Sequence, residues 1–525
     1  MRMFSYLFAH MDAVSTLWQE SLIIGIWWGS RILSPAALLS IVAFTSGPAA
    51  KAVDTLPIAT SAAAQETVPD ALLTEDQKLD QQLADLQRVI GAPAFKSLPS
   101  DTQFQDLTAA AKLAFARDQP RTAYEYVVRA SDMAQATFDD WLTRLQAAIQ
   151  LGSESDAVKS LTVMAQRWPD RVANLEFRLV NEVLGESDAL PHRERLALFR
   201  ALYAMHWTLK GDLEPSRLWR ELALLLLEQG LLREAIDVST RVTDVYVLVA
   251  MRADRRFDAV VTAHPAQFEI NAAGERERRA LESAADAQPT SLELKSRVIF
   301  ALFQQQHYAA MLAETDSVLL AIRSTSSPTR LYEDYYAQFE WFLNLRSYAL
   351  ARNGRWDEAA AELAAASASG HTDQLINLGA LYCRMGRPKE ALAAIARVGA
   401  DTSPNGAMQL ESVRLDAAVQ LGDQIQVTRS MQYLSTHSAD APNAYMKALR
   451  STKQLDRLGE LLAAQLLDPE ERQDALVNVQ DYAAIPGTQW EIDAAAAWRT
   501  AISRRGVQAA IRKVGRIESY HLEQP

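Results

Sequence analysis

The sequence predicts an all-α fold, a solenoid made of antiparallel helix pairs stacked on one another. Residues of high helix propensity, above all Ala, Leu, Glu, Gln and Arg, dominate the composition. Only 20 glycines and 19 prolines interrupt 525 residues, and no sustained alternation of β-branched residues indicates a sheet. Because a chain of this length exceeds one compact core, the core is expected to grow by repetition.

Composition and motif spacing argue against several classes of function. A formal net charge of −12 argues against a nucleic-acid-binding protein, which needs a basic surface to displace counterions. The eight histidines lie far apart, and no zinc-binding spacing, phosphate-binding glycine loop or serine nucleophile motif occurs. The single cysteine, Cys383, cannot form an intramolecular disulfide and is expected to pack inside a helix pair. No catalytic residue, metal or cofactor is predicted, while an enzyme whose site has no local motif stays an alternative.

Residues 1–52 have the features of a signal peptide. Two apolar runs, 22–26 and 32–44, flank a segment that ends in Arg31, and small residues suit cleavage after Ala52 or Ala64. The long stretch before Arg31 is unusual, so the true translation start is left open. The alternative is an uncleaved inner-membrane anchor over 22–44, which would bury Arg31 at a cost of about 2.5–3.5 kcal/mol. Residues 53–73 read as a flexible lead-in to the mature protein.

Residues 74–170 are expected to hold the first helix of the mature chain and two helix pairs. Thr74 and Gln77 have the spacing of a capping box, which opens a helix. A pattern of large and small residues follows, recurs 34 residues later, and has Pro120 opening a second helix. The first copy comprises Leu107, Ala111, Ala123 and Val127, and the second comprises Trp141, Leu145, Gly152, Ala157, Leu161 and Pro169.

Residues 171–330 carry the same pattern in a degenerate form. One clear copy comprises Trp219, Leu222, Ala223, Leu226, Gly230 and Ala235. The pattern is interrupted between residues 169 and 219 and again between 242 and 343, and residues 291–314 look like a helix pair without its glycines. Helix pairs are therefore expected to continue through this region with worn spacing.

Residues 331–475 contain the clearest repeats. In residues 375–404, Gly379 and Ala391 are expected to be small because two helices cross closely there. Gly386 is expected to end the first helix in the left-handed conformation, and Pro388 to open the second. Residues 412–442 and 443–469 look like worn copies. The two clear copies comprise Leu343, Leu350, Gly354, Ala359 and Leu363, and then Leu375, Leu378, Gly379, Tyr382, Ala391, Ile395 and Pro404.

An aromatic stretch at residues 331–345 opens this region. The aromatic residues that share one helical face are Tyr332, Tyr335, Phe339 and Phe342. The periodicity indicates a core stripe. The alternative interpretation places Tyr336 and Glu340 on a ligand-facing surface.

The shared offsets resemble the tetratricopeptide repeat family, whose pattern the segment 375–404 matches position by position. The resemblance implies a right-handed superhelix in which each pair buries its face on the next. It also implies a non-enzymatic protein-binding scaffold, with the first helix of each pair lining a concave groove. The residues that the resemblance places in this groove are Asn344, Tyr348, Arg352, Asn377, Ala380 and Arg384.

Two of these groove residues have the chemistry of an anion site. Arg352 and Arg384 occupy matching positions 32 residues apart, where two guanidinium groups can grip a carboxylate bidentately. The N-terminal copies offer only Lys112 and Gln146 at comparable places. The alternative is a pair of solvated arginines favoured by the helix dipole, and in either case the side chains are expected to be exposed.

Residues 476–525 are expected to cap the last repeat. Within them lies a basic stretch, which is either a solvated face of the cap or a contact for an anionic partner or lipid head groups. The segment 510–522 is left open between helix and extended chain. The basic residues are Arg499, Arg504, Arg505, Arg512, Lys513 and Arg516.

Taken together, these features indicate an exported, periplasmic interaction scaffold of the bacterial cell envelope, whose partner is an envelope protein. Similar periplasmic repeat domains serve polysaccharide export and outer-membrane assembly. The second hypothesis is a groove that binds an extended peptide or glycan directly. The third is an enzyme with an unrecognised site.

Overall fold

The computed structural model describes residues 74–525 except 187–189, 368–370 and 400–401. The expected signal peptide at 1–52, the alternative anchor at 22–44 and the lead-in at 53–73 lie outside the described residues. The chain divides into two compact units, with the boundary in sequence between Trp207 and Thr208. Among the described residues, no helix combines the length and apolar character needed to cross a bilayer.

The unit before this boundary is a stack of helices in which sequence neighbours pack on one another. The capping box is confirmed: the Thr74 hydroxyl accepts a hydrogen bond from the Gln77 amide at 3.3 Å, and the Thr74 amide donates to Gln77 Oε1 at 2.9 Å. Pro120 opens α6 as predicted. The elements are α4 (Glu75–Gly91), η2 (Pro93–Ser97), α5 (Ser100–Ala116), α6 (Pro120–Ser131), α7 (Phe138–Gln150), α8 (Glu154–Arg167), α9 (Pro169–Val172), α10 (Phe177–Glu186) and α11 (His192–Ala204).

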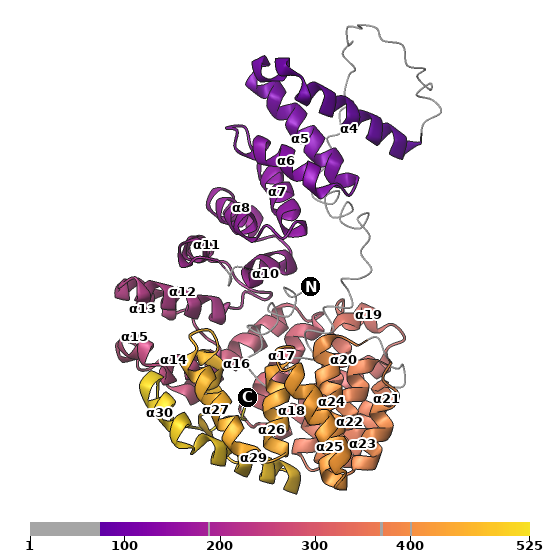
Figure 1. Cartoon of the computed structure of the whole chain (residues 1–525), viewed down its shortest axis with the longest axis vertical. Helices are drawn as coiled ribbons and strands as arrows, with labels where there is room; N and C mark the ends of the chain where they lie inside the picture. Colours follow the sequence, from indigo (N-terminus) through magenta and orange to yellow (C-terminus); the bar gives the residue numbers. More distant parts are fainter. Residues whose placement is uncertain (1–73, 187–189, 368–370, 400–401) are drawn as a thin grey trace. The chain divides into compact units, whose positions relative to one another are not determined.

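The unit from 208 to 525 is a longer solenoid of the same kind (Figure 1). Within its described residues β1 and β2 form a short parallel strand pair. Its elements are α12 (Ser216–Glu228), α13 (Leu232–Ser239), α14 (Val245–Ala253), η4 (Arg255–Phe257), α15 (Asp258–Ala263), α16 (Ile270–Ala287), α17 (Leu292–Gln304), α18 (Tyr308–Ser324), α19 (Pro328–Leu331), α20 (Tyr335–Arg352), α21 (Trp356–Ala366), α22 (Thr372–Arg384), α23 (Pro388–Ile395), α24 (Pro404–Leu421), α25 (Gln424–Thr436), α26 (Pro442–Ser451), α27 (Leu455–Leu467), α28 (Arg472–Asn478), β1 (Asp481–Tyr482), α29 (Gln489–Ile502), α30 (Arg505–Val514) and β2 (Ser519–Tyr520).

Small residues allow the close helix crossing that the sequence predicts. A Cβ atom added to Gly379 would lie 2.7 Å from a methyl group of Ile395 and 3.0 Å from one of Val413. Ala391 is fully buried in α23, which Pro388 opens, and Gly386 has the left-handed φ of 73°. The structure is therefore an all-α, tetratricopeptide-like solenoid, with degenerate repeats among the clear ones.

The turns inside the helix pairs show why the worn copies still fold. In the clear copies glycine takes the left-handed conformation, which costs other residues steric strain. In turns without a glycine, Asp118, His206, Gln306 and Lys453 take it instead, with φ between 54° and 58°. The turn geometry is thus kept where the glycine signal is lost.

The aromatic stretch differs in part from the expectation of one helical face. Tyr332 lies in the break between α19 and α20, although it is buried with Phe342 as predicted. The break has a structural cause, because the Asp334 carboxylate accepts backbone hydrogen bonds from Leu292 at 2.7 Å and Glu293 at 3.1 Å. The start of α20 is thereby used to cap the start of α17.

The two ends of this unit pack together. Helix α14 contacts α28, and Ala253 of α14 belongs to the same apolar cluster as Leu476 and Val507. Gly515, directly after α30, pairs with Asp254 directly after α14. We call this contact the seam. It returns the C-terminal residues to repeats some 260 residues earlier in the chain, which decides the geometry of the site below.

Candidate functional site

The predicted groove residues lie together on α20 and α22. The Asn377 side-chain amide donates to Asn344 Oδ1 at 3.2 Å. The Arg384 guanidinium lies over the Tyr348 ring, 5.7 Å from its centroid. Asn344 and Tyr348 are buried. The repeat register therefore brings these four side chains into two contacting pairs, as matching positions on neighbouring helices should be.

Arg352 and Arg384 contact carboxylates that come from the same chain. Arg352 Nη1 lies 3.0 Å from Glu491 Oε1, and Arg352 Nη2 lies 2.7 Å from Glu523 Oε1. Arg384 Nη1 lies 3.8 Å from the same Glu491 oxygen. We call these four residues, with Tyr308, the carboxylate site; the Tyr308 hydroxyl donates to Glu523 Oε2. Binding of an outside partner there stays a prediction.

The expectation that both arginines are exposed is wrong. The exposed fraction of the side chain is 7% for Arg352 and 15% for Arg384. Helix α29, which carries Glu491, and the C-terminal residues around Glu523 cover them. Repeat spacing predicts contacts only between neighbouring repeats. It therefore did not predict that Arg352 is covered by Glu491 and Glu523, which lie 139 and 171 residues later in the sequence.

Burial and charge oppose each other at the carboxylate site. Burial acts to raise the pKa of Glu491, but Arg384 and Arg352 outweigh it and hold that pKa below its ordinary value. For Glu523 burial wins, and its pKa is raised although Arg352 and Tyr308 oppose the shift. Burial acts to lower the pKa of Arg352, and the two carboxylates raise it overall. The site therefore favours a carboxylate that is paired with arginine and costs free energy when that pairing is lost.

We call residues 515–525 the C-terminal tail. The tail runs past the C-terminal ends of helices α14 and α17. The Arg516 amide donates to the Ala253 carbonyl at 3.0 Å, at the end of α14. The Glu523 amide donates to the Gln304 carbonyl at 2.8 Å, at the end of α17. Between these points Ser519 and Tyr520 pair in parallel with β1. Backbone hydrogen bonds thus fix the tail along its length.

Two side chains from the repeats bind carbonyl groups of the tail. The Gln306 side-chain amide donates to the Leu522 carbonyl at 2.8 Å. The Tyr246 hydroxyl donates to the Glu523 carbonyl at 2.6 Å. Gln306 is one of the non-glycine residues in a left-handed turn. The turn in which Gln306 replaces the usual glycine therefore supplies a side chain that contacts the tail.

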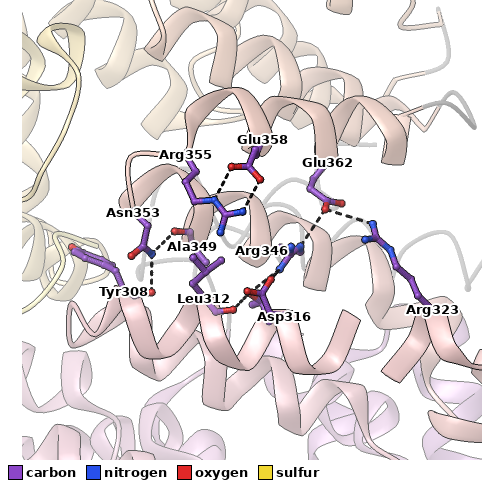
Figure 2. A network of polar contacts seen from close by, with 11 residues as sticks. Tyr308, Leu312, Asp316, Arg323, Arg346, Ala349, Asn353, Arg355, Glu358 and Glu362 are labelled. Carbon is purple, nitrogen blue, oxygen red and sulfur yellow. Dashed lines mark hydrogen bonds and ion pairs between the residues drawn. The ribbon is translucent and has the colours of Figure 1, made fainter. Parts of the chain in front are cut away.

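A separate polar network between α18, α20 and α21 holds α20 in place (Figure 2). Arg346 lies between helices, with Nη1 2.5 Å from Asp316 and Nε 3.3 Å from Glu362. Nearer the carboxylate site, the Asn353 side-chain amide donates to the Tyr308 carbonyl at 2.9 Å. This last bond joins the end of α20 to the residue whose hydroxyl binds Glu523, so Figure 2 shows part of the support of the carboxylate site.

The remaining candidate surface residues lie elsewhere. Tyr336 is 85% exposed, and Glu340, one turn later, pairs with His371. Of the basic C-terminal residues, Arg504 pairs with Asp456 and Arg516 with Asp258. The other four of that set, which are exposed, are Arg499, Arg505, Arg512 and Lys513.

Cys383 packs in a buried apolar cluster of its helix pair, as expected. Burial raises the pKa of the Cys383 thiol to about 12, and its sulfur lies 3.7 Å from the Val413 carbonyl oxygen. A thiol of this kind is a poor nucleophile at neutral pH. Among the described residues, no group of three His, Cys, Asp or Glu side chains is placed to hold a metal ion.

Sequence reasoning missed Arg252, which pairs with Glu518 of the tail. It also missed Gln306, Tyr308, Glu491 and Glu523. A signal existed for Arg252, because it occupies the last turn of its helix, as Arg352 and Arg384 do. Glu491 has the spacing of a capping box with Thr488, which indicates a helix start but not a contact with Arg352, and Glu523 carried no local signal.

Comparison with known proteins adds little to these observations. No protein-family model matches the sequence, and no curated protein matches it. Structural similarity extends to a monomeric mutant of IFIT1 with m7Gppp-AAAA, at 11% identity and a TM-score of 0.25 over 85% of this chain and 86% of that one. The TPR domain of P58(IPK) gives 12% and 0.17 over 72% and 99%. The APC/C hetero-tetramer Cut9-Hcn1 gives 13% and 0.22 over 84% and 97%. These values are too low to transfer a property from those proteins to this chain.

Proposed function

We propose that this chain is a non-enzymatic scaffold that binds a protein partner at the residues of α20 and α22 predicted to line the groove. The observation that supports the proposal is the carboxylate site, where Arg352 and Arg384 from successive repeats face acidic side chains. Planar guanidinium groups recognise carboxylates with defined geometry, which suits selective protein binding. An extended peptide is favoured over a glycan as the bound polymer, because Glu523, three residues after β2, already contacts Arg352 at the end of α20.

Site-specific photo-crosslinking in the source cells tests this proposal. A photoreactive residue at Ala380, which lies in α22 and is one of the residues predicted to line the groove, should capture the partner. The matched control is Lys389 in α23 of the same helix pair, which is exposed. The captured protein is then identified and the complex reconstituted from purified components. Capture from both positions alike, or failure of reconstitution, would count against binding at this face.

We further propose that the protein is exported to the periplasm of a bacterial envelope and works there. The support is the signal-like sequence of residues 1–52. N-terminal sequencing of the native protein should give a start near Val53 or Gln65. An intact Met1 or Met11 on a membrane-bound species would favour the anchor alternative instead.

A further inference from the structure

The C-terminal tail is bound as a peptide ligand would be. Main-chain hydrogen bonds run along it: the Asp481 amide donates to the Glu518 carbonyl at 3.0 Å, and the Ala483 amide donates to the Tyr520 carbonyl at 2.9 Å. Such main-chain hydrogen bonds can bind any extended peptide, because they do not involve its side chains. The parallel pairing with β1 covers only two residues on each strand, so little regular sheet holds the tail.

Side chains of the tail alternate between bound and exposed. Glu518 pairs with Arg252, Tyr520 is 8% exposed, and Leu522 is 1% exposed. The residues between them, Ser519 and His521, face solvent. Pockets for alternate side chains are what gives specificity when an extended peptide is recognised. Glu523 breaks the alternation, because it is buried against Arg352.

Two side-chain contacts tie the end of the tail to the repeats. The Gln306 side-chain amide donates to the Leu522 carbonyl at 2.8 Å. Glu523 is buried and lies 2.7 Å from Arg352. Removing one partner of a buried ion pair is costly, so this contact favours a segment that carries a carboxylate at this position.

We propose that the tail occupies, in cis, a binding site for an extended acidic peptide segment of a protein partner, which binds by replacing the tail beyond Arg516. This inference rests on the proposed function and names its ligand. The ligand presents an acidic residue, an aromatic residue two positions later, then leucine two positions after that, followed directly by a second acidic residue. These four side chains take the places of Glu518, Tyr520, Leu522 and Glu523.

The root of the tail stays in place during the exchange. A Cβ atom on Gly515 would lie 2.3 Å from the Ala253 carbonyl oxygen, so the backbone of the seam is in tight contact there. Residues 517–525 contain only the two residues of β2 and no helix. Their release therefore displaces no helix of the described chain, and an incoming segment meets a preformed set of partners.

The probe for the test is a fluorescent peptide with the sequence of residues 517–525, IESYHLEQP. The full-length chain should bind it weakly, because its own tail competes. The double variant Leu522→Ala/Glu523→Ala should bind it at least about tenfold more tightly, since the competing state is weakened. The matched control His521→Ala changes an exposed tail residue and should behave as the wild type. A probe with glutamine in place of its second glutamate should bind the double variant about tenfold more weakly.

A folded double variant that gains no affinity for the peptide would overturn the inference. If the double variant does not fold, native-state hydrogen exchange on the wild-type chain decides. The Asp481 and Ala483 amides, which the tail protects, should then exchange by a partial opening at least about tenfold faster than the amides of α22. If both sets of amides exchanged only through global unfolding, the tail would be a fixed structural part.

Swapping of the tail between two copies of the chain, seen as dimers by light scattering, would also overturn the assignment to a partner. Captured partner without any peptide effect would leave the proposed function intact and remove this inference alone.

Discussion

At the scale of single residues, buried and exposed arginines next to each other have different roles. Arg352 is buried between two carboxylates, whereas Arg355 pairs with Glu358 while both stay exposed (Figure 2). Arg352→Ala should lower the free energy of unfolding by about 2–3 kcal/mol, less than for a locked ion pair because the tail can leave its site. Arg355→Ala should leave the free energy of unfolding nearly unchanged, because solvent screens an exposed ion pair. Urea unfolding of both variants measures this, and equal losses would contradict it.

Asp373 provides a pH dependence at the same scale. Burial, with repulsion from Glu340, raises its pKa from 3.8 to about 7. The folded state then binds more protons than the unfolded state between about pH 4 and 7, so the free energy of unfolding falls as pH rises through this window. Asp373→Asn should remove this decline and be more stable than the wild type at about pH 8, by on the order of 1–3 kcal/mol. Parallel stability curves for the two proteins would refute the assignment.

At the scale of helix pairs, the close crossing of α22 with α23 and α24 depends on one glycine. Gly379→Ala puts a methyl group 2.7 Å from Ile395 and should cost about 1–3 kcal/mol by overpacking. The matched control is Gly506→Ala in α30, where nothing lies within 4 Å of the added Cβ; better helix propensity should make it neutral or stabilising by up to about 1 kcal/mol. Thermal melts compare the two. A neutral Gly379→Ala would mean that the helices move apart freely.

At the scale of the whole unit 208–525, the seam should make distant repeats unfold together. An ordinary solenoid is stabilised by nearest neighbours alone. Gly515→Val places side-chain atoms against Ala253 and Leu476 and should open the seam, so that α14 and α28 lose hydrogen-exchange protection together while α20–α24 keep theirs. Gly399→Val, with nothing within 4 Å, is the control. If only α28–α30 lost protection, the seam would contribute nothing to cooperativity.

Local sequence patterns determined the fold of this protein. The Thr74 capping box, the left-handed Gly386, Pro388 and the small Gly379 depend on residues close in sequence or one repeat away, so periodic spacing is enough to predict them. For the same reason the pairing of Asn344 with Asn377 was within reach, 33 residues apart.

Only the tertiary structure decided what covers the candidate site. Arg352 meets Glu523 and Glu491 because the solenoid turns far enough for the C-terminal residues to return to α14 and α17. The return of the chain results from small rotations that add up over successive helix pairs. A local sequence pattern does not predict the total rotation. Whether an arginine at the end of a repeat helix is solvated or buried in an ion pair therefore depends on which distant residues the superhelix brings against it, not on its neighbours in sequence.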